Sequence, residues 1–128
     1  MNENAKNALT GDASMVLVYD IRRDERLKAD LFGRAPEQLN HYFENKVATS
    51  VFEGRITELC YAAYDAQHCF KVHDGEATHC YERLGDDSWY VVGRHVQVEQ
   101  ADFEMPYPTG RMPIVTRIWI GSEKPQNK

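Results

Sequence analysis

The dipeptide Asp74-Gly75, which lies between two short runs rich in β-forming residues, most constrains the fold of this chain. An Asp-Gly pair between such runs predicts a β-hairpin, because glycine readily adopts the positive φ angles of tight hairpin turns. The two runs cover residues 68–73 and 76–84. If the pair forms a two-residue loop, Cys69 lies opposite Cys80 on the neighbouring strand. The pattern therefore predicts antiparallel β-structure in this half of the chain.

The residues before the hairpin predict two helices that follow a first strand. Apolar residues from Arg23 to Gly33 recur at helical spacing, and Pro36 suits the first turn of a second helix. Residues 51–64 fit either a helix or a strand, and Gly54 favours the strand. Further strands are expected over residues 15–19, 89–99 and 114–120.

These elements predict an α+β fold, in which an N-terminal strand and two short helices pack on a curled antiparallel sheet. The sheet is expected to have four to five strands, arranged as a meander or as a small barrel. We expect one domain over residues 14–121, with a polar arm at 1–13 and a polar tail at 122–128. The size of the chain, 128 residues, is typical of a single domain.

Alternation along the predicted strands assigns the side chains to two faces of the sheet. The apolar face, which we expect to form the core, contains Phe70, Val72, Ala77, Tyr81, Tyr90, Val92, Val96 and Val98. Trp89 and Val91 fall on the opposite face. Exposed together they would form an apolar patch, so we expect this face to be covered by other strands or by a second copy of the chain.

Several polar residues share the predicted core face and form a candidate pocket: His68, His79, Tyr81 and Arg94. In the predicted register His79 lies between Phe70 and Arg94. On a curved sheet these side chains could line a concave face and bind an anion or a carbonyl group, with His79 as an acid or base. A ligand-binding or simple enzymatic pocket is therefore the alternative function.

The sequence predicts no metal site, no cofactor and no catalytic set. His73 lies too far along the strand from Cys69 and Cys80 to share one ion with them, and His68 and His79 point to the other face. The glycines show no nucleotide-binding spacing. Three cysteines, an odd number, favour reduced thiols and a cytoplasmic location. The start of the chain shows no signal-peptide pattern, and no apolar run is long enough to span a membrane.

Charge favours binding of a protein partner as the main function. Residues 53–104 hold eleven acidic and four basic residues, within a chain of net charge −5. Such a surface argues against nucleic-acid binding and would attract a basic partner. The expected contacts are three acidic residues, Glu82, Asp86 and Asp87, together with Tyr107, which lies in a proline-rich loop at 104–113. The sequence thus predicts a small interaction protein, such as an inhibitor, an immunity-type protein or an accessory module.

Overall fold

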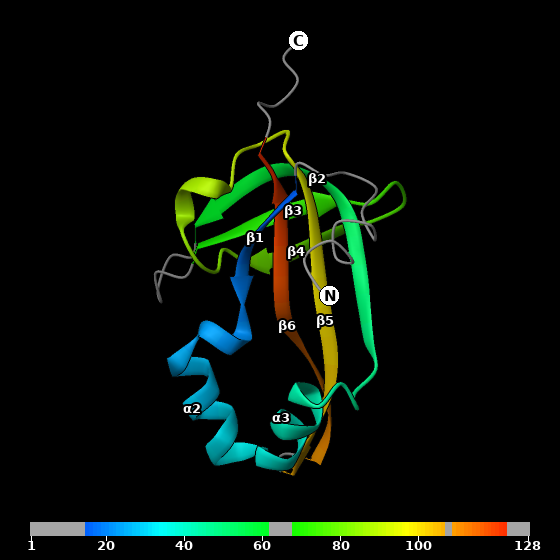
Figure 1. Ribbon diagram of the computed structural model, residues 1–128. Helices are drawn as coiled ribbons and strands as arrows, with labels where there is room; N and C mark the ends of the chain where they lie inside the picture. Colours follow the sequence, from blue (N-terminus) through cyan, green and yellow to red (C-terminus); the bar gives the residue numbers. More distant parts are fainter. Residues whose placement is uncertain (1–14, 62–67, 107–108, 123–128) are drawn as a thin grey trace.

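The computed structural model describes residues 15–61, 68–106 and 109–122 and confirms the α+β class (Figure 1). The sheet is open and has six strands, one more than the upper limit expected. The expected arm at 1–13 and residues 123–128 of the expected tail lie outside the described residues. In chain order the elements are β1 (Met15–Asp20), η1 (Ile21–Arg23), α2 (Glu25–Arg34), α3 (Pro36–Phe43), β2 (Thr49–Tyr61), β3 (His68–His73), β4 (Thr78–Glu82), η2 (Asp87–Trp89), β5 (His95–Pro106) and β6 (Thr109–Gly121).

The strands do not form the expected meander. Their order across the sheet is β1-β6-β5-β2-β3-β4, so β5 lies between β2 and β6 and not beside β4. The connection after β4 leads the chain back to β2, where the Ile56 N–H donates to the carbonyl of Arg94 and the Gly93 N–H donates to the carbonyl of Ile56. Gly93 has a φ of 99°, which favours glycine. These contacts start β5 alongside β2, and residues 89–94 are therefore not strand.

The β3–β4 hairpin forms, but its register differs from the prediction. His73 pairs with Thr78, so the two central turn residues are Gly75 and Glu76, one position later than expected. Gly75 has a φ of 102°, as turns with glycine at the first central position require. The Asp74 carboxylate fixes this turn by accepting hydrogen bonds from the N–H groups of Glu76 and Ala77, both at 2.9 Å.

In the observed register each residue of β3 lies opposite a β4 residue two positions later than predicted. Side chains alternate between the faces, so a shift of two residues leaves each side chain on its predicted face. Phe70, Val72 and Tyr81 are buried as expected. Ala77 and Val92, which were also expected in the core, are exposed.

Two hydrophobic cores lie on opposite faces of the long β5–β6 hairpin. The first core includes Val96 and Val98 and packs under β2, β3 and β4. The second includes Ala101 and Phe103 and packs against α2 and α3. Successive side chains of a strand point to opposite faces. The core residues of β5 have even numbers in the first core and odd numbers in the second, so the two sets lie on opposite faces of the hairpin. Figure 1 shows the helices at one end of the hairpin and β2–β4 across the other.

A buried polar cluster ties α3 to the hairpin where the faces change. The register shifts at Glu99, and one of its carboxylate oxygens accepts three hydrogen bonds. The donors are the Tyr42 hydroxyl at 2.9 Å, the Thr116 hydroxyl at 2.6 Å and the Arg117 Nε at 3.1 Å. Burial, as the main cause, raises the pKa of Tyr42, and the Glu99 charge adds to this. Tyr42 therefore acts as a neutral donor to Glu99.

Trp89 does not lie on the outer face of a strand. It ends η2 and packs against the first core, with the Arg94 guanidinium 5.7 Å from the centre of its ring. The predicted position of Trp89 on the outer face of a strand is therefore wrong, and with it the apolar patch for which we expected a cover of other strands or of a second copy. The proline-rich segment at 104–113, expected as a loop, instead continues β5 to Pro106 and starts β6 at Thr109.

Candidate functional site

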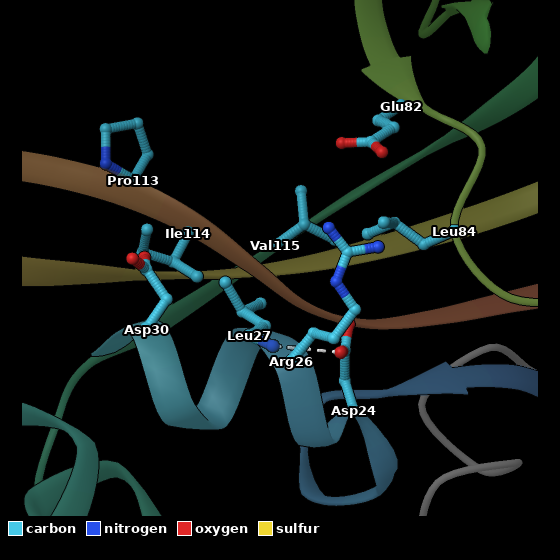
Figure 2. A pocket seen from close by; sticks show the side chains of 9 residues that line it. All are labelled: Asp24, Arg26, Leu27, Asp30, Glu82, Leu84, Pro113, Ile114 and Val115. Atoms are coloured by element: carbon cyan, nitrogen blue, oxygen red, sulfur yellow. Dashed lines mark hydrogen bonds between the residues drawn. The ribbon is translucent and has the colours of Figure 1, made fainter. Parts of the chain in front are cut away.

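A groove lies beside the part of β6 that runs on past the end of β1. β1 pairs only with Arg117–Gly121 of β6. Within the described residues, the same edge of β6 has no strand neighbour before Arg117. The groove there has a volume of about 640 Å³ and runs between α2, β6 and the end of β4 (Figure 2). It occupies the place where a longer β1 would continue.

The groove combines an apolar floor with mainly acidic walls. Its apolar lining comes from three separate segments of the chain: Leu27, Leu84, Pro113, Ile114 and Val115. Three carboxylates and one guanidinium complete the lining: Asp24, Asp30, Glu82 and Arg26. In Figure 2 the Arg26 side chain extends from α2 towards the wall formed by Leu84 and Glu82. The described lining therefore carries an excess of negative charge and also offers apolar contacts.

Two of the three carboxylates already have partners. Asp24 caps α2 by accepting from the Leu27 N–H at 3.0 Å, and it also accepts from the Tyr19 hydroxyl at 2.8 Å. Burial first, and then this bond to Asp24, raise the pKa of Tyr19 well above its usual range. Asp30 pairs with Arg34 at 3.2 Å. Glu82 is exposed and makes no ion pair within the described part of the chain. Of the three carboxylates it is therefore the most available to bind a ligand.

The structure places only one of the predicted partner contacts in the groove. Glu82 lines it, whereas Asp86 caps η2 by accepting from the N–H and the hydroxyl of Ser88. These bonds lower the pKa of Asp86, the backbone N–H having the larger effect. Asp87 lies 3.3 Å from the guanidinium of Arg83, whose side chain is buried. Asp86 and Asp87 therefore hold the connection after β4 in shape. Tyr107 lies outside the described residues.

The four residues of the predicted pocket do not come together as expected. His79 lies opposite Val72, and its ring stacks near Tyr81 at 6.3 Å between centroids. The His68 ring instead contacts Tyr61 at 4.8 Å, and Arg94 lies over Trp89. None of His68, His79, Tyr81 and Arg94 lines the groove in Figure 2.

His79 has a partner on the hairpin turn, where Asp74 Oδ2 lies 2.9 Å from its Nε2. The N–H groups of Ala77 and Glu76, followed by His79, hold the pKa of Asp74 well below its usual range. A carboxyl whose pKa is lower in the folded than in the unfolded state stabilises the fold above the unfolded pKa, which is about 4. This stabilisation is lost as the pH falls below that value.

Asp74→Asn should therefore flatten the acid limb of the stability profile. Between pH 5 and pH 2 the wild type should lose more unfolding free energy than the variant, because an asparagine side chain at this position has no carboxyl to protonate. Urea unfolding at a series of pH values, followed by circular dichroism, measures the difference. Parallel pH profiles for the two proteins would contradict the assignment.

Three cysteine side chains form a cluster that the sequence did not predict. The Sγ atoms of Cys60, Cys69 and Cys80 all lie within 4.8 Å of one another. Cys60 and Cys69 form a disulfide, and Cys80 is a free, exposed thiol. Cys69 and Cys80 lie on neighbouring strands and Cys80 is reduced, as predicted. The predictions that they lie directly opposite each other and that Cys69 is reduced are wrong. Cys80 pairs with Lys71, and Cys69 lies between Cys60 and Glu82. The missed partner, Cys60, lies in the segment whose secondary structure was ambiguous.

Comparison with models of known protein families gives no match, and no curated protein matches the sequence. Within the residues described, no helix is both long and apolar enough to span a membrane. Two features of the described residues on which a function can rest are the groove beside β6 and the three clustered cysteines.

Proposed function

We propose that the protein is a non-catalytic binding module that holds an extended, basic segment of a partner protein in the groove beside β6. An inhibitor, an immunity-type protein or an accessory module would act in this way. We place its action in the cytoplasm, where the reducing environment would convert the Cys60–Cys69 disulfide into two thiols. The observation that carries the proposal is an acidic groove with an apolar floor, located at a strand edge that has no strand neighbour among the described residues.

The free edge of β6 supports an extended ligand. Edge strands present unpaired N–H and C=O groups, and peptides commonly bind proteins by adding a strand to such an edge. Pro113 lacks an N–H, so it can offer only its carbonyl. A strand rises about 3.3 Å per residue, so a bound segment of about four residues would run alongside Pro113–Thr116.

The lining of the groove supports a segment that alternates apolar and basic side chains. Successive side chains of a strand point to opposite sides, so one set would meet Leu27, Ile114 and Leu84. The other set would meet the carboxylates, of which Glu82 is the most available. The acidic excess of residues 53–104 would also speed the approach of a basic partner, and salt would screen this attraction.

A labelled peptide of alternating lysine and valine is expected to bind the protein, and its affinity should fall as salt rises. The same peptide with glutamate in place of lysine should bind much more weakly. Glu82→Lys should weaken binding of the lysine peptide about three- to tenfold, since an exposed ion pair contributes up to about 1 kcal/mol and reversal makes the contact repulsive. Fluorescence anisotropy measures all three effects.

Glu76→Lys is the matched control, because Glu76 is exposed in the β3–β4 turn and does not line the groove. It makes the same change in net charge and should alter the affinity by less than about twofold. Equal binding of the two peptides, or equal effects of Glu82→Lys and Glu76→Lys, would contradict the proposal.

A further inference from the structure

We propose that Cys60, Cys69 and Cys80, when reduced, form a three-thiolate site for copper(I). The three residues come from the neighbouring strands β2, β3 and β4, so the sheet itself sets the spacing of their sulfur atoms. All three Sγ atoms already lie within 4.8 Å of one another. Small side-chain movements would bring them to one ion, because metal–sulfur bonds are about 2.3 Å long.

The donor set points to the kind of ion. Thiolates are soft ligands and select soft ions such as copper(I), as well as zinc. Structural zinc sites almost always have four ligands in a tetrahedron. Within the described residues the cluster contains three donors and no fourth histidine, cysteine or carboxylate. Copper(I) is stable with three sulfur ligands, so the set favours it over zinc.

The site opens only after reduction of the Cys60–Cys69 disulfide. A dithiol reductant supplies the two electrons and two protons that convert this bond into two thiols, and is itself oxidised to a disulfide. Binding of copper(I) then forms three Cu–S bonds and releases the three thiol protons to solvent. In the oxidised chain only Cys80 keeps a thiol, so the site is closed.

The position of the cluster suits exchange of an ion with solvent or with another protein. The cysteines lie on the face of β3 opposite Phe70 and Val72, which point into the first core. Cys80 is exposed and gives an ion access to the site.

Titration of the phosphine-reduced protein with copper(I) alone, without oxygen and against a chromogenic copper(I) chelator, tests the proposal. We expect one copper(I) per reduced chain and none per oxidised chain. Cys80→Ser should lower the affinity more than about 100-fold, since loss of even an outer partner of a metal ligand costs roughly 10–100-fold. Thr78→Ser, a conservative change at an exposed position of the same strand, should leave the affinity unchanged. X-ray absorption should show three sulfur ligands.

Four results would overturn the proposal. They are absence of copper(I) binding by the reduced protein, unchanged affinity in Cys80→Ser, a two-sulfur copper shell, and loss of the fold on reduction. Circular dichroism of the reduced protein detects the last of these. The groove is lined by other residues, so the copper titration and the peptide titration can each fail without the other.

Discussion

Phe70→Ala is expected to lower the free energy of unfolding by about 3–5 kcal/mol. Phe70 has no exposed surface and lies at the centre of the first core. Its ring lies 5.7 Å from that of Tyr81 and 4.8 Å from that of Tyr90, between centroids. The substitution removes these contacts and leaves a cavity that the rigid strands around it cannot close. Urea unfolding followed by circular dichroism measures the loss.

Phe32→Ala is the matched control for this prediction. The Phe32 side chain lies on α2 and is 62% exposed, so its removal should change stability by less than about 0.5 kcal/mol. Comparable losses in the two variants would contradict the assignment of Phe70 to the core.

The second large effect is expected for Glu99→Ala, which should lower the free energy of unfolding by about 3 kcal/mol. The Arg117 side chain is only 14% exposed, and without Glu99 it would be a largely buried charge without its carboxylate partner. The hydroxyl groups of Tyr42 and Thr116 would lose the same acceptor. Glu99→Gln keeps an acceptor oxygen without the charge, so it should cost less than Glu99→Ala. Chemical unfolding of both variants measures the two losses.

Glu104→Ala is the matched control, because it also removes a carboxylate from β5 but from outside the buried cluster. Glu104 is exposed on the same strand, so its removal should change stability by less than about 0.5 kcal/mol. If Glu99→Ala lowers the free energy of unfolding no more than Glu104→Ala does, the buried cluster does not stabilise the packing of α3 on the hairpin.

The elements of this fold were more predictable than their arrangement. The hydrophobic spacing before Gly33 and the proline at 36 mark α2 and α3, and the Asp74-Gly75 pair marks the β3–β4 hairpin. These are local signals. The pairing of β5 with β2 joins segments far apart in the chain, and it depends on contacts such as that between Ile56 and Arg94. A local pattern carries no information about such pairing.

The same limit applies to the candidate site. Glu82 was expected as a contact from charge alone, and it does line the groove. The groove itself could not be predicted, because Leu27, Leu84 and Ile114 come from three separate segments. The cysteine cluster was missed because residues 62–67 carry no turn signal from which the register of Cys60 could be calculated.

The central claim is that an extended basic segment binds along β6, and mapping of amide chemical shifts tests it most directly. Titration with the lysine–valine peptide should shift the amide signals of Ile114–Thr116 and of Leu27, with smaller changes elsewhere. β4 is the other end of the sheet and also carries Glu82, so it is the main competing edge. Shifts that follow Thr78–Glu82 and leave Ile114–Thr116 unchanged would contradict the claim.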